Sequence, residues 1–104
     1  EEHFRALIEH ASDLVLILGA RGRIEYASPS LARLLGHRPA EWLGVELARL
    51  VHPADAGALG ESLGAAPLQP IELRLRHAQG EWHVLEGTVA DLRRNPAVGG
   101  LVLN

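Results

Sequence analysis

The sequence predicts a single α+β domain whose strands form an antiparallel sheet. Its 104 residues supply one hydrophobic core and no more. Two pairs of apolar segments are each joined by a short loop that ends in glycine, which is typical of antiparallel hairpins. Segments with helical spacing of apolar residues precede the first pair and separate it from the second. The predicted order is therefore helix, two strands, several short helices and three strands.

The composition indicates a folded protein and argues against several classes of partner. Hydrophobic residues make up 47% and charged residues 22% of the chain, and the net charge is −3. With no excess of basic residues and no apolar run longer than Leu14–Leu18, we expect neither a nucleic-acid partner nor membrane insertion. The absence of cysteine excludes disulfides and thiolate sites and favours a cytoplasmic location. With no initiator methionine and no signal peptide, the chain is expected to be a domain of a longer protein.

The first predicted helix covers residues 1–11. Phe4, Leu7, Ile8 and Ala11 recur at the spacing that places side chains on one face of a helix. The pattern stops at residue 12, so a short amphipathic helix is expected to open the domain.

The first strand pair follows this helix. Leu14–Leu18 is apolar at every position, which predicts a central strand that is covered on both faces. Arg23–Ala27 alternates polar and apolar residues, as a half-buried strand does. Gly22 can adopt a positive φ at the end of the intervening loop, so the two strands are predicted to pair antiparallel.

Three short helices are predicted next, over Ser28–Gly36, Pro39–Gly44 and Pro53–Gly64. Each has proline near its start and glycine at its end, a common punctuation of helices. Ser28 is predicted to cap the first of them, and Asp55 to interact with the dipole of the last. The last helix should be weak, because each of its glycines costs about 1 kcal/mol relative to alanine. These glycines are Gly57, Gly60 and Gly64.

The last third of the chain returns to strands. Pro70–Arg76 and Glu81–Val89 alternate, and a positive φ at Gly80 would place Leu75 opposite His83. The apolar residues that then share one face are Ile71, Leu73, Leu75, Leu85 and Val89. A fifth strand is predicted over residues 100–104, after a turn-rich loop.

In this order, the segments resemble the PAS sensor domain over the whole chain. The matching stretches are Phe4–Glu9, Asp13–Leu18, Gly22–Pro29, Leu34–Gly36, Val51–Asp55, Glu72–Arg76, Gly80–Trp82 and Glu86–Thr88. The resemblance implies a five-stranded antiparallel sheet of order 2-1-5-4-3, with short helices on one face and an N-terminal helix or a partner subunit on the other. It also implies one sensor domain over residues 1–104, with a helix at 1–11 and a core at 12–104. The signalling helix that commonly follows the fifth strand in this family is not expected in this chain, which stops at Asn104.

In function, the resemblance implies a sensory module rather than an enzyme. Such domains serve multidomain proteins, often bacterial-type histidine kinases or cyclic-dinucleotide enzymes, whose output domain would be a partner. Without cysteine, the chain cannot hold the cysteine-linked flavin or chromophore of some relatives. Haem-binding relatives place their axial histidine inside the helix that corresponds to residues 53–64. Haem is not expected here, because these residues contain no histidine and His52 is predicted to orient the turn at the start of the helix. The six histidines show no metal-ligand spacing.

Two hypotheses about the activity follow. In the first, a small apolar ligand binds between the sheet and the helices, with His83 either as a polar anchor or as an ordinary core histidine. The residues expected to contact it are Tyr26, Leu43, Leu47, Leu59, Leu63, Leu73, His83 and Leu85.

In the second hypothesis, the domain only mediates protein–protein interaction, as a homodimer without ligand. The residues expected in that interface lie on the first helix and on the outward side of a strand: Phe4, Leu7, Ile8, Trp82 and Val84. As an alternative, the N-terminal helix of the same chain covers Trp82 and Val84, which would leave a monomer.

Overall fold

The computed structural model describes residues 13–64, 68–94 and 100–103. The predicted helix over residues 1–11, with Phe4, Leu7 and Ile8, lies outside these residues. The strands are β1 (Leu16–Leu18), β2 (Ile24–Ala27), β3 (Leu68–Arg76), β4 (Trp82–Leu92) and β5 (Gly100–Leu103). The helices are α2 (Ser30–Leu35), α3 (Pro39–Trp42) and α4 (Ala56–Gly64), with 3-10 turns η1 (Ala20–Gly22), η2 (Leu47–Arg49) and η3 (Pro53–Asp55).

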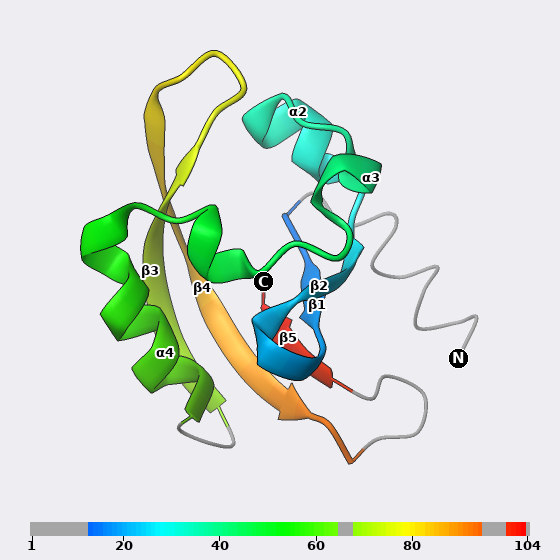
Figure 1. Cartoon of the computed structure of the whole chain (residues 1–104), viewed down its shortest axis with the longest axis vertical. Coiled ribbons are helices and arrows are strands. Elements are labelled where there is room, and N and C mark those ends of the chain that lie inside the picture. Colours follow the sequence, from blue (N-terminus) through cyan, green and yellow to red (C-terminus); the bar gives the residue numbers. More distant parts are fainter. Residues whose placement is uncertain (1–12, 65–67, 95–99, 104) are drawn as a thin grey trace.

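The strands form one antiparallel sheet in the order β2-β1-β5-β4-β3. The helices α2, α3 and α4 lie on one side of it (Figure 1). This arrangement confirms the predicted α+β class. All three residues of β1 are buried, as expected for a strand covered on both faces.

The β3–β4 hairpin has the predicted register. Leu75 lies opposite His83 and Leu73 opposite Leu85, and Gly80 has the positive φ that the turn requires. Both strands are longer than predicted. β3 begins at Leu68, which pairs with Ala90 of β4, and β4 continues to Leu92, which pairs with Gly100 of β5. Pro70 is tolerated within β3, since an outer strand needs no inter-strand N–H on its open side.

Helix α2 begins differently from the prediction. Ser28 does not cap it; its buried Oγ accepts a hydrogen bond from the backbone N–H of Val15 (2.9 Å) and lies 2.8 Å from Ser30 Oγ. Ser28 therefore fastens the start of α2 to the segment before β1. At the other end, Gly36 has φ +76° and ends the helix, as predicted.

The predicted helix over Pro53–Gly64 is two elements, the 3-10 turn η3 and then α4. His52 orients this turn as expected, because its Nδ1 accepts a hydrogen bond from the N–H of Ala54 (3.1 Å). Leu59 is the buried residue of α4. Gly60 is exposed, and a Cβ added there would have no atom within 4 Å.

The segment of residues 44–55, which we call the strap, contacts both outer strands of the sheet; it is the green connection between α3 and α4 in Figure 1. At β2, the N–H of Ile24 donates to the carbonyl of Val45 (2.9 Å). At β3, the N–H of His52 donates to the carbonyl of Arg74 (2.9 Å). Between these attachments, Leu47 is completely buried. The strap thus joins the two sides of the sheet through the core.

Candidate functional site

A cavity of about 330 Å³ lies between the inner face of the sheet and the elements that cover it. Its apolar wall comes from the segment leading into β1, from β1, α2, the strap, β3 and β4, and consists of Leu14, Leu16, Leu34, Leu47, Ile71, Leu73, Leu75 and Leu85. Among the described residues, Gly87 and three polar residues, Asp13, Glu86 and Thr88, also line it. A concave leucine-rich site with few polar groups is the usual form of a small-molecule pocket.

The alternation of β3 and β4 builds one wall of this cavity. Side chains two residues apart point to the same face of a strand, so Leu73 and Leu75 face the core beside Leu85 of the neighbouring strand. Leu47 of the strap contributes to the cavity from another element. Leu85 is only half-buried, which leaves part of its apolar surface open to the cavity.

Three of the eight predicted ligand contacts line this cavity: Leu47, Leu73 and Leu85. Leu59 belongs to the packed core, and Leu63 lines a separate hollow beside the β1–β2 loop. Tyr26 is half-buried on β2, where it pairs with Ile17, and is not part of the lining.

Two predicted contacts are placed differently from the expectation. Leu43 is 49% exposed, because α3 ends at Trp42 and it is Trp42 that turns into the core. His83 shares the inner side of the hairpin with Leu75 but lies toward its turn, outside the cavity. Its ring stacks on His77 (5.1 Å between centroids), and its Nε2 lies 3.5 Å from a carboxylate oxygen of Glu81. His83 thus lies on the predicted side of β4, but it is only half-buried and does not line the cavity.

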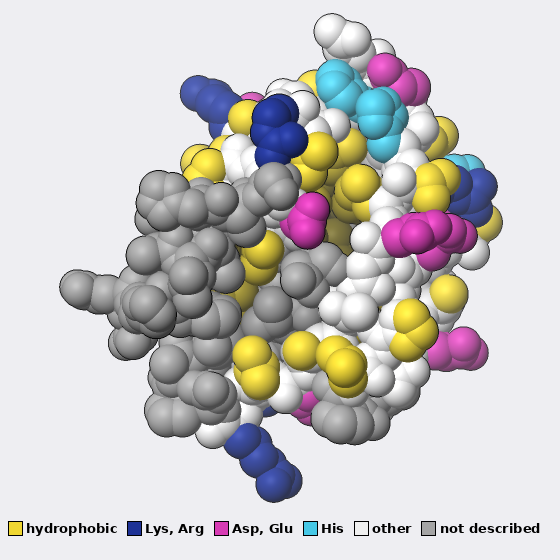
Figure 2. All heavy atoms as spheres, turned by 180° about the vertical axis from the view of Figure 1, so that it is seen from behind, with side chains coloured by type: hydrophobic (Ala, Val, Ile, Leu, Met, Phe, Trp, Pro, Cys, Tyr) yellow, Lys and Arg dark blue, Asp and Glu magenta, His cyan; other side chains and the backbone are white. Residues whose placement is uncertain are grey.

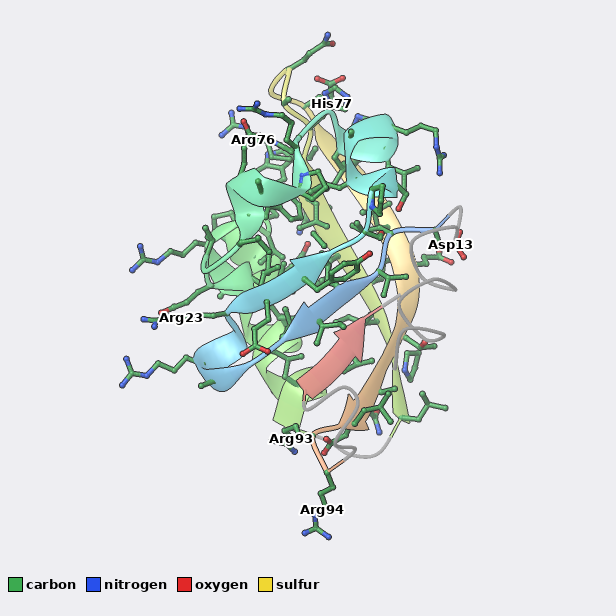
Figure 3. All side chains as sticks on the ribbon, turned by 90° about the vertical axis from the view of Figure 1, so that its right-hand side faces the viewer. Asp13, Arg23, Arg76, His77, Arg93 and Arg94 are labelled. Carbon is green, nitrogen blue, oxygen red and sulfur yellow. The ribbon has the colours of Figure 1, made fainter. Side chains whose placement is uncertain are left out.

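The polar residues gather where the cavity opens. Asp13 precedes β1, and Glu86 and Thr88 stand on β4, so the opening lies between these two parts of the sheet. Figure 2 shows a hollow with hydrophobic side chains at its floor and acidic side chains at its rim. Figure 3 shows Asp13 at the end of the β1 segment, beside β4. Sequence reasoning missed Asp13 and Glu86, because no local pattern indicates that they share one opening.

The outward side of β4 carries the two exposed residues that were predicted for an interface. Val84 is 59% exposed and Trp82 is 38% exposed. Trp82 is partly covered by the ring of His52 (4.8 Å between centroids) and by the guanidinium of Arg76 (5.5 Å from the ring centroid). Val84 therefore offers the more open apolar surface of the two.

Asp55 has a different role from the predicted one. Instead of interacting with the helix dipole alone, its carboxylate accepts hydrogen bonds from the backbone N–H (2.9 Å), Nε (3.0 Å) and a terminal nitrogen (2.9 Å) of Arg74. These bonds favour the ionised carboxylate and lower the pKa of Asp55 from 3.8 to about 2. The pair anchors the end of the strap to β3.

Within residues 13–64, 68–94 and 100–103, no three His, Cys, Asp or Glu side chains come together as a metal site. Among the helices of those same ranges, none is long and apolar enough to cross a membrane.

Comparison with known proteins shows similarity to one family. Residues 2–89 match the family described as PAS fold. The chain is 36% identical over 84 residues to White collar 2 protein of Neurospora crassa, an alignment that covers 77% of this chain and 16% of that protein. It is 34% identical over 61 residues to blue light receptor lreA of Aspergillus flavus, covering 59% of this chain and 7% of that protein. The chain thus spans a small part of these relatives, and their fungal origin gives no support to the expected bacterial one.

Solved structures show the same fold. A PAS domain from Colwellia psychrerythraea superposes with a TM-score of 0.82 at 17% identity, covering 99% of this chain and 92% of that one. A domain of a sensory box sensor histidine kinase/response regulator from Geobacter sulfurreducens gives a TM-score of 0.75 at 25% identity, covering 97% and 88%.

Proposed function

This chain belongs to the PAS family, and we propose that it is a sensory module that takes up a small apolar ligand in the leucine-lined cavity. The cavity is the observation that carries the proposal. Its volume of about 330 Å³ lies at the lower end of the range typical of small-molecule sites, about 300–1,000 Å³. The described residues of the lining include no cluster of groups for catalysis, so we propose binding and relay rather than a reaction.

The strap supplies a route from the ligand to the rest of the domain. Leu47 lines the cavity, and the segment that carries it is hydrogen-bonded to β2 on one side and to β3 on the other. A ligand that displaces Leu47 would therefore act on both outer strands at once. Close-packed interiors transmit such displacements, because they have little free space to absorb them.

We further propose that residues 1–104 form one regulatory domain of a larger cytoplasmic signalling protein, with the output activity in another domain. The sensory box histidine kinase from Geobacter sulfurreducens supports this setting, and the absence of cysteine is the reason for the cytoplasmic location. One relative is named a blue light receptor. A light response through a flavin–cysteine bond is not proposed here, because the chain has no cysteine.

Ligand uptake can be tested with native mass spectrometry and with 1-octanol as a neutral apolar probe. We expect either a discrete extractable mass on the purified protein or saturable chemical-shift changes at the cavity residues on titration with 1-octanol. Leu85→Trp should abolish both by filling the cavity. Val84→Trp is the matched control, because it adds the same side chain one residue away on the outward face. A protein that carries no extra mass and does not bind 1-octanol would contradict the proposal.

A second candidate function is homodimerisation through the outward face of β4, which the exposure of Val84 favours. Light scattering after gel filtration would measure the mass in solution. Val84→Glu should shift a dimer toward the monomer, whereas Ala48→Glu, an exposed change on the strap, should not. A dimer that survives both Val84→Glu and Trp82→Glu would place the interface elsewhere.

A further inference from the structure

The opening of the cavity is acidic, although its interior is apolar. Asp13 and Glu86 both line the cavity, and both are exposed where it meets the solvent. From this arrangement we infer that the cavity selects ligands with an apolar body and a cationic head group, such as a long-chain primary amine. The inference rests on the proposed ligand-binding function and specifies the class of ligand.

A third acidic side chain strengthens the negative potential at this opening. Glu72 lies directly opposite Glu86 in the register of β3 and β4, and both side chains are exposed. Opposed like charges on neighbouring strands destabilise a sheet unless a cation lies close to them. A cationic head group at the opening would relieve this repulsion.

The neighbouring arginine does not neutralise the pair. Arg74 is close enough to Glu72 for the two charges to interact, but its Nε and a terminal nitrogen are held by Asp55 at 3.0 and 2.9 Å. Its charge is thus directed to another carboxylate, on the strap side of β3. Asp13 and Glu86 therefore give the opening a negative charge, and Glu72, opposite Glu86 on β3, adds to it.

The geometry orients such a ligand. The apolar body would lie along Leu73 and Leu85, where removal of its methylene groups from water favours binding. The ammonium would remain at the opening, within reach of Asp13 and Glu86. Because both carboxylates are exposed, each should contribute only about two- to fivefold to affinity. A ligand with an apolar body of the same length and an anionic head group should have an affinity lower by a similar factor.

The test uses three probes of equal chain length: n-octylamine, 1-octanol and n-octanoate, which at neutral pH are cationic, neutral and anionic. Their affinities for the whole chain are measured by calorimetry and NMR titration at low salt. We expect n-octylamine to bind about five- to tenfold more tightly than 1-octanol, and n-octanoate to bind least tightly. Added salt should reduce this preference, because it screens exposed charges.

Charge variants then assign the preference to the opening. Asp13→Asn and Glu86→Gln should each reduce the octylamine preference, and the double variant should remove it. Glu86→Lys should raise the affinity for n-octanoate above that of the native chain. Glu61→Gln is the matched control, because Glu61 is an exposed carboxylate on α4 outside the cavity lining.

The outcomes separate the two proposals. Equal binding of all three probes, or an octylamine preference that survives the double variant, would overturn the inference about charge and leave ligand uptake intact. Failure of all three probes to bind to protein that carries no extractable mass would overturn the proposed function itself.

Discussion

Replacing Gly60 by alanine should stabilise this domain, because Gly60 occupies an exposed helical position in the middle of α4. A Cβ built at this position has no atom within 4 Å, so the substitution introduces no steric conflict. Alanine is favoured over glycine in a helix interior by about 1 kcal/mol, partly because glycine loses more backbone freedom on folding. For a domain of this size, about 1 kcal/mol corresponds to a rise in Tm of about 4–8 °C.

The assay is thermal unfolding by circular dichroism, together with urea unfolding to obtain the free energy. Gly36→Ala provides a control of opposite sign. Gly36 has φ +76°, and a Cβ there would lie 3.1 Å from His77 Cε1 and 3.2 Å from Ala78 Cβ, so this variant should have a lower Tm. An unchanged or lower Tm for Gly60→Ala would refute the reasoning, since it would mean that α4 is not helical at Gly60 or contacts something at that site. Affinity for 1-octanol should not change, because α4 contributes no residue to the described lining of the cavity.

Three further substitutions test the contacts described above. Leu47→Ala should cost about 2–5 kcal/mol of unfolding free energy, because Leu47 is fully buried. Leu47→Met should cost less than about 1.5 kcal/mol, because it nearly conserves the volume. Equal urea midpoints for the two variants would contradict the packing described. Ser28→Ala should cost about 1–3 kcal/mol, because it removes the acceptor of the buried Val15 N–H, and an unchanged urea midpoint would argue against that bond. Because bonding to Arg74 lowers the pKa of Asp55 from 3.8 to about 2, the stability that its ionisation provides is complete above pH 3.8 and is lost as the pH falls through about 2. Asp55→Asn should therefore unfold at lower urea than the native chain at neutral pH and lose less stability over that acid range, and equally steep acid profiles would refute this assignment.

Features that depend on neighbouring residues were predictable from the sequence. The positive φ of Gly80 and the alternation around it are sufficient to set the β3–β4 register, and Gly36 ends α2 as its position suggests. The uniformly apolar run that contains β1 indicates a strand covered on both faces. In each of these cases, the residues that determine the structure are close to each other in the sequence.

The features that could not be predicted depend on partners far away in the chain. Ser28 could cap a helix, but the N–H of Val15, which is 13 residues earlier, takes its oxygen instead. Asp55 could interact with a helix dipole, but Arg74 on β3 binds it more strongly. These choices between two plausible partners are decided by tertiary packing.

The cavity shows the same limit. A leucine-rich sequence does not reveal which leucines fill the core and which leave a space: Leu59 is packed, whereas Leu85 borders the cavity. The acidic opening was missed for a related reason, because Asp13 and Glu86 are brought together only by the order of the strands.

The strap also bears on how this protein avoids aggregation. The outer strands of an open sheet present unpaired backbone groups that can recruit a strand from another molecule. Here the strap forms hydrogen bonds with the backbone N–H of Ile24 on β2 and the backbone carbonyl of Arg74 on β3. Farther along β3, Pro70 has no backbone N–H to donate. These contacts leave fewer free backbone groups on the two outer strands for pairing with a second copy of the domain. Loosening the strap should expose these backbone groups of β2 and β3 and so favour edge-to-edge association between copies of the domain.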